Sequence, residues 1–401
     1  MNPRTLVYAA GSFGFAYTST LFTQWIVFRH ASRAAPALLA LALGVKYLLE
    51  GGASPLVGAW TDRHGGAALR KRILVLGALP LAAIFAGLWQ ADVFGLLLVP
   101  LFGLVGTLVC QPYGALITSV SRTPEERNVN ALASAGSAFA GAGAAFVLGP
   151  KLAGSGAFGT LAATGAVALA AFVFVPALFL EAGPPPQPSP RSVMGGRTVL
   201  WHAGMPLYLA GNAMLALGGV ALMTAAPFVV QEALAAPPEA LATLNLALVA
   251  GVVVAALAMS SLSRRVAPGK ILAASGVLGS VVALGAAAST GGSQALYAMG
   301  FAVLGVTLFA SVAAPPLILA RFAEEDGRKR EGAFFGLSGL ATNVGNGAGA
   351  ALTSLLMAPL GVRGLLVVSG LALLLGGVLQ ALVPARTAPT AEATPSVLAP
   401  T

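Results

Sequence analysis

The chain has 401 residues, of which 57% are hydrophobic and only 9% are charged, and its mean hydropathy is +0.86. A soluble globule of this length needs more polar surface to face water, so the composition excludes an ordinary soluble protein. The net charge of +9 does not imply a nucleic-acid partner, because membrane proteins keep basic residues beside anionic headgroups.

Uniformly apolar runs of about twenty residues predict helices that cross a bilayer, because a helix satisfies its own backbone hydrogen bonds in lipid. The roughly ten-residue alternating segments of an outer-membrane barrel are absent from the sequence. Read against turn and charge signals, the runs predict twelve spans, at about Leu6–Arg29, Ala37–Trp60, Ile73–Gln90, Gly95–Ser119, Asn128–Pro150, Ala157–Leu180, Met205–Val230, Leu241–Leu262, Ile271–Thr290, Gln294–Ala320, Ala333–Met357 and Gly364–Val383.

The expected architecture is an all-α integral membrane protein with two pseudo-symmetric six-helix halves, residues 1–182 and 204–384. Residues 183–203 begin with a proline-rich stretch that predicts a cytoplasmic linker, and residues 385–401 predict a disordered cytoplasmic tail. The two halves are also weakly similar in sequence. An apolar helix leads into a mixed-charge turn in both Pro112 to Arg127 and Pro316 to Arg328. Such weak duplication is typical of transporters built from repeats.

Basic residues predict the orientation. Most of the 22 lysines and arginines lie near the chain ends or in the even-numbered loops, whereas the odd-numbered loops hold Arg29, Arg33, Lys151 and Arg363. Because cytoplasmic loops carry the excess of basic residues, we expect both termini in the cytoplasm. The protein is therefore expected to be a multi-pass monomer of the cytoplasmic (inner) membrane.

One short basic loop separates the second and third spans: Gly58-Ala-Trp-Thr-Asp62-Arg63-His-Gly65-Gly66-Ala-Ala-Leu-Arg70-Lys71-Arg72. A basic loop with a single carboxylate between two membrane-length helices resembles the cytoplasmic signature of the major facilitator superfamily. The resemblance implies a conformational charge latch, and its expected members are Asp62, Arg63, Arg70, Arg72, Arg127, Arg330 and Glu331. The alternative is that these charges only set the topology.

Two further loops resemble one branch of that superfamily, the glycoside-pentoside-hexuronide:cation symporters to which melibiose permease belongs. Pro112-Tyr-Gly-Ala followed by Leu116-Ile-Thr-Ser-Val-Ser-Arg-Thr-Pro-Glu-Glu-Arg127-Asn is similar to its four-to-five loop, and Asp326-Gly-Arg-Lys-Arg330-Glu331-Gly332-Ala-Phe-Phe335-Gly336-Leu to its ten-to-eleven loop. Tyr8-Ala-Ala-Gly-Ser-Phe-Gly14 and Glu50-Gly-Gly-Ala-Ser-Pro55-Leu-Val-Gly58 are similar to parts of its first two helices. The resemblance implies the major facilitator fold and cation-coupled transport.

The chain departs from this branch at its charged positions. The paired coupling acids of helix two correspond to Glu50 and Ser54, so one carboxylate remains. Neutral residues stand where the branch has its other functional charges, namely Phe13, Cys110, Ala135 and Asn343. The resemblance therefore implies the fold, but it does not imply the charged cation-binding and sugar-binding residues of melibiose-type transporters.

Lys46 and Glu50 lie four residues apart on the second span, with Ser54 one turn further, so the three share a helical face. Counted from Ala37, Lys46 lies roughly 13 Å deep and Glu50 about 20 Å deep, where ionisable groups are costly unless they face water or each other. We expect all three to face the cavity between the halves and to couple transport to a cation. A proton is expected rather than Na⁺, which would lack anionic oxygen ligands. The alternative is a self-neutralising pair that only orients the helix.

Neutral polar residues recur at helical spacing in spans that line the cavity of this fold. The expected substrate-binding residues are Tyr17, Thr20, Gln24, Gln111, Asn130, Asn212, Asn343 and Asn346. The alternative role for each is to hold neighbouring helices together by hydrogen bonds.

These observations predict a secondary active transporter that moves a small neutral or zwitterionic solute, such as a sugar or glycoside, by alternating access. The alternatives are a proton-driven exporter or lysolipid mover on the same fold, and a sensor without flux. The chain has one cysteine and three histidines that lie far apart in the sequence, so we expect no metal site. No nucleophile–base–acid arrangement is present in the sequence, so we do not expect an enzyme. The expected partners are the small-molecule substrate and the lipid bilayer, without nucleic acid and without a cofactor beyond the coupling H⁺ or Na⁺.

Overall fold

The computed structural model describes residues 3–64, 66–90, 92–121, 124–180, 200, 204–262, 265–289, 293–326 and 331–384. Within these residues every regular element is a helix, as the composition predicts. The expected linker, 183–203, lies outside the described residues except for Leu200, and so does the whole expected tail, 385–401.

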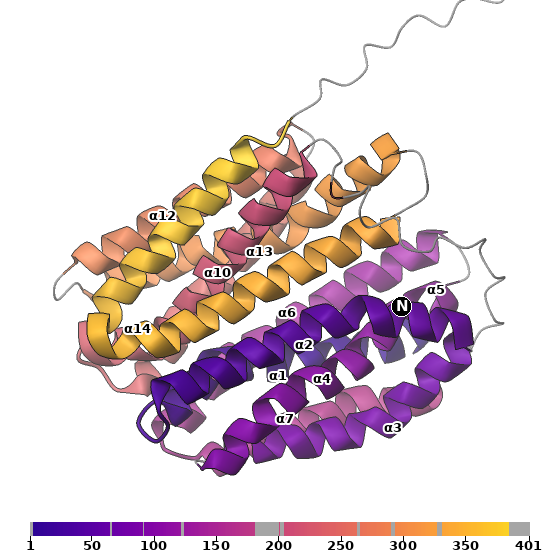
Figure 1. Cartoon of the computed structure of the whole chain (residues 1–401), viewed down its shortest axis with the longest axis horizontal. Helices are drawn as coiled ribbons and strands as arrows, with labels where there is room; N and C mark the ends of the chain where they lie inside the picture. Colours follow the sequence, from indigo (N-terminus) through magenta and orange to yellow (C-terminus); the bar gives the residue numbers. More distant parts are fainter. Residues whose placement is uncertain are drawn as a thin grey trace, which may run out of the picture.

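The helices form two groups that lie side by side (Figure 1). The N-terminal group comprises α1 (Pro3–His30), α2 (Pro36–His64), α3 (Gly66–Gly87), α4 (Val93–Ala115), α5 (Ile117–Val120), α6 (Pro124–Gly154), α7 (Phe158–Leu169), the π-helical turn η1 (Ala170–Phe174) and α8 (Val175–Phe179). The C-terminal group comprises α10 (Met205–Phe228), the π-helical turn η2 (Val229–Ala233), the 3₁₀ turn η3 (Pro238–Ala240), α11 (Leu241–Leu262), α12 (Pro268–Ala288), α13 (Gln294–Asp326) and α14 (Glu331–Ala381).

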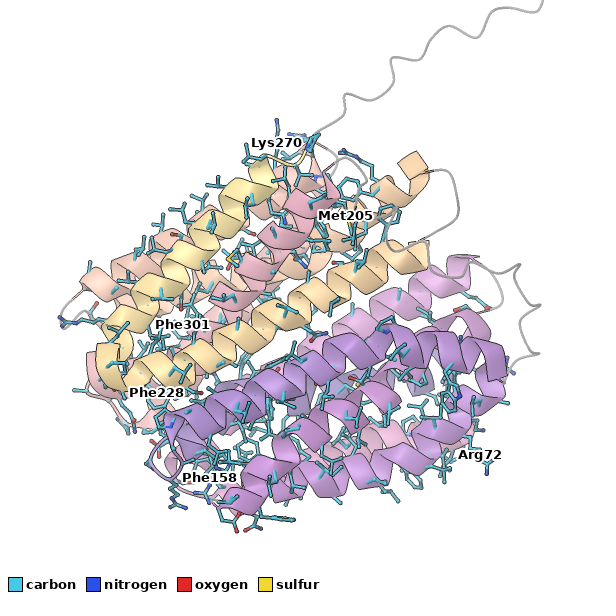
Figure 2. All side chains as sticks on the ribbon, in the orientation of Figure 1. Arg72, Phe158, Met205, Phe228, Lys270 and Phe301 are labelled. Atoms are coloured by element: carbon cyan, nitrogen blue, oxygen red, sulfur yellow. The ribbon has the colours of Figure 1, made fainter. Side chains whose placement is uncertain are left out.

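The helices run up and down between two ends of the bundle. The proximal end is the one at which α1 begins, and Tyr8 there stacks on Tyr113 near the end of α4, with ring centroids 5.0 Å apart. The distal end is the one at which α1 finishes, and there the His30 ring nitrogen lies 2.9 Å from the Leu88 carbonyl oxygen just beyond α3. Figure 2 shows Arg72 toward the proximal end and Phe158, Phe228 and Phe301 toward the distal end.

Nine of the described helices are long and apolar enough to cross a membrane. The helices α1 and α3 are not among these nine. The first carries a run of hydroxyl and amide residues, and the second begins near Arg70, Lys71 and Arg72. The last two expected spans both lie in α14, which contains a break at Gly361 (φ 62°, ψ −174°). Glycine tolerates this positive φ, which folds the chain back without an intervening loop.

Contacts within each group are extensive, and α2 packs against α14 at the boundary between the groups. Close approach there depends on residues without side chains. A Cβ added at Gly347 of α14 would lie 2.9 Å from Tyr47 Cβ, and one added at Gly51 of α2 would lie 3.2 Å from Asn343 Cβ. Small residues allow membrane helices to approach this closely.

Gly103 on α4 allows an equally close approach inside the N-terminal group. A Cβ added there would lie 2.6 Å from Lys46 Cγ, 2.9 Å from the Lys46 carbonyl oxygen and 3.3 Å from Glu50 Cγ. The clash includes backbone, which cannot rotate away, so α2 itself would have to move.

We therefore expect Gly103→Ala to lower the free energy of unfolding by about 1–3 kcal/mol, the usual effect of overpacking. The matched control is Gly114→Ala on the same helix, where an added Cβ meets nothing within 4 Å. Thermal unfolding in detergent should show a lower Tm for the first variant only. Equal Tm values for both variants would contradict the packing argument.

Candidate functional site

A cavity of about 950 Å³ lies between the two groups of helices. The N-terminal group contributes α1 and α6 to its wall, and the C-terminal group contributes α10, α11, α12, α13 and α14. Its lining extends from Thr23 and Phe146 to Leu319 and Phe335, which lie near the proximal ends of α13 and α14. A cavity of this size and position can enclose a small solute between two bodies that move.

The cavity wall is mainly apolar, and no residue in the described lining carries a charged side chain. Its polar groups are hydroxyls and amides: Ser19, Thr20, Thr23, Asn212, Ser275, Thr307, Ser311, Ser338, Thr342 and Asn346. Such groups can orient an uncharged solute by hydrogen bonds. They cannot neutralise a fully charged one, whose desolvation would be costly.

Three of the eight expected binding residues line this cavity: Thr20, Asn212 and Asn346. The Asn212 amide nitrogen donates to Thr342 Oγ1 at 2.7 Å, and Thr342 in turn donates to the Ser338 carbonyl oxygen at 2.9 Å. The network fixes the Asn212 side chain against α14. Its carbonyl oxygen is the acceptor that a bound hydroxyl group could use.

The other five expected binding residues are not in the cavity lining, and four of them make bonds elsewhere. Tyr17 donates to Thr164 Oγ1 at 3.1 Å, Asn130 donates to Ser121 Oγ at 2.8 Å, and Gln111 donates to Ser54 Oγ at 3.0 Å. Gln24 bonds Asn245, and Asn343 lies beside Gly51 at the contact of α2 with α14. These side chains tie helices together, the alternative role that the sequence left open.

Seven polar members of the lining were not among the expected binding residues: Ser19, Thr23, Ser275, Thr307, Ser311, Ser338 and Thr342. A signal was present, because Thr307 and Ser311 are four residues apart, as are Ser338 and Thr342. Pairs at this spacing lie on one helical face. The structure was needed only to show where these residues lie relative to the cavity.

The structure does not confirm the prediction that Lys46, Glu50 and Ser54 face the cavity between the halves. None of them belongs to its lining. The Lys46 ammonium lies 3.0 Å from each carboxylate oxygen of Glu50, 4.7 Å from the centre of the Phe22 ring and 3.6 Å from that of Tyr47. The pair therefore faces Phe22 of α1 and Gly103 of α4, and 21% of the Glu50 side chain is exposed. Helical spacing shows which residues share a face but not what that face contacts.

Ser54 extends this charged pair toward α4. Its hydroxyl donates to the Glu50 carbonyl oxygen at 2.8 Å and accepts from the Gln111 amide. The next residue to Lys46, Tyr47, packs on Gly347, so the pair adjoins the contact between α2 and α14. A change in its charge would act where the two groups of helices meet.

The expected charge latch is only partly within the described residues. The side chains of Asp62, Arg63, Arg127, Arg330 and Glu331 lie outside them. Arg70 is buried and donates to the Ala115 carbonyl oxygen at 3.2 Å, and Arg72 is exposed. The latch stays a prediction.

At the distal end the two groups of helices are joined by hydrogen bonds. Gln24 of α1 and Asn245 of α11 exchange amide bonds of 3.4 Å, and Asn245 also donates to the Phe146 carbonyl oxygen of α6 at 2.8 Å. Thr224 of α10 donates to the Thr23 carbonyl oxygen at 3.1 Å. This distal seal closes the cavity at one end.

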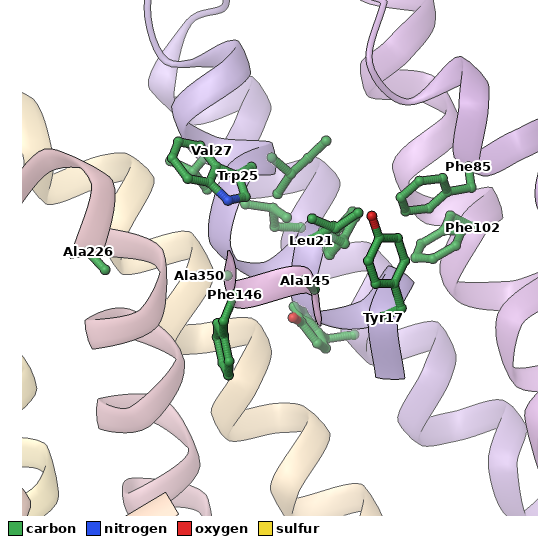
Figure 3. Close-up of a cluster of buried hydrophobic side chains, with 14 of the residues drawn as sticks. Tyr17, Leu21, Trp25, Val27, Phe85, Phe102, Ala145, Phe146, Ala226 and Ala350 are labelled. Carbon is green, nitrogen blue, oxygen red and sulfur yellow. The ribbon is translucent and has the colours of Figure 1, made fainter. Parts of the chain in front are cut away.

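Aromatic packing supports the distal seal. Trp25 donates to Gln24 at 3.1 Å and is fully buried. Figure 3 shows Trp25 and Phe146 on the side of α1 nearer Ala226 of the C-terminal group, whereas Phe85 and Phe102 gather around Tyr17 within the N-terminal group. The rings of Phe28 and Phe228 meet across the boundary with centroids 5.3 Å apart.

Comparison with known families agrees with this architecture. The model of a family described as MFS/sugar transport protein matches residues 7–385, nearly the whole chain. The chain belongs to this family. It is thus a membrane transporter of the major facilitator superfamily rather than an enzyme.

Two solved structures share the transporter's fold. Both are of a bacterial homologue of the human lysosomal transporter Spinster. The inward-facing, occupied form has a TM-score of 0.68 at 15% identity and covers 95% of each chain; the inward-facing, unoccupied form has a TM-score of 0.64 at 15% identity and covers 94% of each. No curated protein matches the chain.

The distal seal of the transporter predicts a specific response to mutation. Asn245→Leu removes three hydrogen bonds and leaves the Gln24 amide in an apolar setting, which costs about 1–3 kcal/mol. We expect the seal to open more often, so that a cysteine at position 19 of the cavity, in a Cys110→Ala background, reacts at least about fivefold faster with an impermeant thiol reagent applied from the distal side.

Ser369→Ala provides the control for this experiment. Its hydroxyl is equally buried but bonds the Leu365 carbonyl oxygen of its own helix, so it should leave the labelling rate unchanged. Labelling of the Asn245 variant at the wild-type rate would exclude the seal as a gate.

Proposed function

We propose that the transporter moves a small uncharged solute with both hydroxyl groups and apolar surface, such as a glycoside, through the central cavity by alternating access. The observation that carries this proposal is the cavity between the two groups of helices, with its apolar wall, its hydroxyl and amide groups and its charge-free described lining. A fully polar sugar would leave much of that wall without matching contacts, and a charged solute would find no counter-charge.

The distribution of basic residues predicts which end of the bundle faces the cytoplasm, and this orientation decides the side to which the cavity opens. If the proximal end, where the chain begins, faces the cytoplasm of an inner membrane, the distal seal closes the outer side. The cavity then represents the inward-facing state. The two Spinster-homologue structures of the same fold were also captured inward-facing, which agrees with this proposal.

The solute can be identified by a thermal-shift screen of sugars, glycosides, nucleosides and lysolipids, followed by uptake into proteoliposomes. With the best solute, we expect Asn212→Leu to lower uptake about tenfold or more, because the variant removes the Asn212 amide from the cavity wall. Thr353→Val is the control, since Thr353 is buried on the same helix as Thr342 but bonds only its own helix at Gly349. Equal loss in both variants would argue against solute binding at Asn212.

We further propose that Lys46 and Glu50 couple this movement to protons. Both oxygens of the Glu50 carboxylate are already 3.0 Å from the Lys46 ammonium, so Na⁺ would have to displace a cation to gain ligands. A proton can instead neutralise Glu50 and release Lys46. Because Tyr47 and Gly51 of the same helix contact α14, this release would reach the boundary between the helix groups.

Coupling and stability can be separated with two variants. Glu50→Gln alone leaves a buried ammonium without its partner, which destabilises a protein by about 3–5 kcal/mol. Lys46→Met with Glu50→Gln removes both charges, so its Tm should return close to that of the wild type. We expect this double variant to exchange solute at equilibrium but not to accumulate it when a pH gradient is imposed.

Accumulation by the double variant at the wild-type level would show that the pair serves structure alone. Uptake that follows a Na⁺ gradient instead of the pH gradient would reassign the coupling ion.

The alternative function, movement of a lysolipid or another amphiphile on the same fold, is favoured by one observation. The apolar wall of the cavity is formed by residues such as Phe139, Val220, Met223, Leu248 and Phe335. In the thermal-shift screen, stabilisation by lysolipids but by no glycoside would select it.

A further inference from the structure

A second cavity, of about 450 Å³, lies inside the C-terminal group near the distal end. Its walls come from α10, α12, α13 and the segment of α14 that follows Gly361. Phe301, which Figure 2 places toward that end, is one of the lining residues. We call this cavity the lateral groove.

The lateral groove reaches the outer surface of the helix bundle, where lipid would surround the protein. Three of its lining residues are large, apolar and exposed: Leu296 (49%), Met299 (62%) and Val281 (63%). At its opposite side, Ala283, Ala226 and other lining residues are buried. The groove therefore leads from the lipid-facing surface into the body of the C-terminal group.

The inner wall of the groove is shared with the central cavity. Leu222 of α10 and Leu304 of α13 line both. Two aliphatic side chains, each with alternative staggered rotamers, thus stand between the groove and the transport cavity. A change of their rotamers is a small movement compared with the parting of two helices.

One end of the groove is polar. Ser289, at the end of α12, donates to the Ala286 carbonyl oxygen at 2.9 Å, so the Tyr297 hydroxyl, 3.1 Å away, donates to Ser289 Oγ. The lone pairs of Tyr297 can then accept from another molecule. Leu304 lies seven residues further along α13, roughly 10 Å deeper in the bundle.

We infer that the lateral groove is an entrance from the membrane through which a single-chain amphiphile reaches the central cavity. Its hydroxylated head would lie at Ser289 and Tyr297 near the membrane surface, and its alkyl chain would lie between α12 and α13 and point toward Leu222 and Leu304. This inference rests on the proposed function, and it adds the route of entry and a substrate class with an alkyl chain.

The chemistry of the lining selects an alkyl chain. Apart from Ser289 and Tyr297, the side chains of the groove are aliphatic or aromatic hydrocarbons and one thioether, Met299. A hydroxylated chain would lose its hydrogen bonds to water there without replacement, whereas an alkyl chain exchanges one apolar environment for another. A short, fully polar glycoside would be excluded from the groove and would use the proximal opening.

A glycine in the wall allows the groove to be blocked. Gly285 of α12 lines it, and a Cβ added there meets no atom within 4 Å. Gly285→Phe should therefore place a ring in the groove without displacing a helix. Gly159→Phe is the matched control, because Gly159 is likewise exposed near the distal end of its helix and an added Cβ meets no atom within 4 Å, but it lies outside both cavities.

The experiment uses octyl glucoside below its micellar concentration and methyl glucoside, which share a head and differ in their chain. In proteoliposomes, we expect Gly285→Phe to slow octyl glucoside transport at least about tenfold and to leave methyl glucoside transport unchanged. Gly159→Phe should change neither rate. Octyl glucoside transport at the wild-type rate in Gly285→Phe would overturn the inference.

Occupancy of the groove is measured separately, so that failure of transport does not obscure it. An octyl glucoside with a diazirine at the chain terminus should photolabel Leu222 or Leu304 in nanodiscs, and Gly285→Phe should abolish that labelling. If no glucoside is transported but the labelling occurs and is lost in Gly285→Phe, the proposed function is wrong for glucosides and the groove remains an amphiphile site. Labelling that is absent from the wild type, or that persists in Gly285→Phe, would overturn the inference.

Discussion

Polar groups inside a hydrocarbon environment need partners within the protein, and this constraint organises the transporter. Helices satisfy the backbone. The polar side chains that remain find partners in the protein: Lys46 pairs with Glu50 on α2, Gln111 of α4 bonds Ser54 of α2, and Gln24 of α1 bonds Asn245 of α11. Groups such as Asn212, which keeps an acceptor oxygen at the cavity, are the ones left to meet a solute.

The same constraint explains how far the sequence could be interpreted. Apolar length predicted most of the membrane helices, and the spacing of Lys46 and Glu50 correctly placed the two side chains in contact. Helical spacing could not show what this face contacts, because Phe22 and Gly103 come from other helices and approach only in the folded chain.

Polar residues at helical spacing were equally ambiguous. Thr20, Asn212 and Asn346 line the cavity, whereas Tyr17 and Asn130 have the same kind of sequence environment and bond neighbouring side chains. The difference depends on the position of partners such as Thr164, far away in the sequence. The break at Gly361, by contrast, falls in the gap that the sequence predicts between the spans Ala333–Met357 and Gly364–Val383.

The absence of charge from the described cavity lining and the presence of the lateral groove are consistent with each other. Leu222 and Leu304 belong to both walls, so an environment suited to hydrocarbon continues from the outer surface to the centre. The charged pair lies instead on the other side of the α2–α14 contact, within the N-terminal group. Under the proposed function, solute contacts and proton coupling would lie on different helices, which meet where α2 packs on α14.

The reversal at Gly361 has a mechanical consequence. Since no loop separates the two segments of α14, the end of the first segment is tied directly to the start of the second at Gly361. The first segment packs on α2 and borders the central cavity with Thr342 and Asn346, and the second begins beside Leu366 in the wall of the lateral groove. In the proposed mechanism, the rocking that exposes the solute alternately to the two sides would therefore also move a wall of the lateral groove.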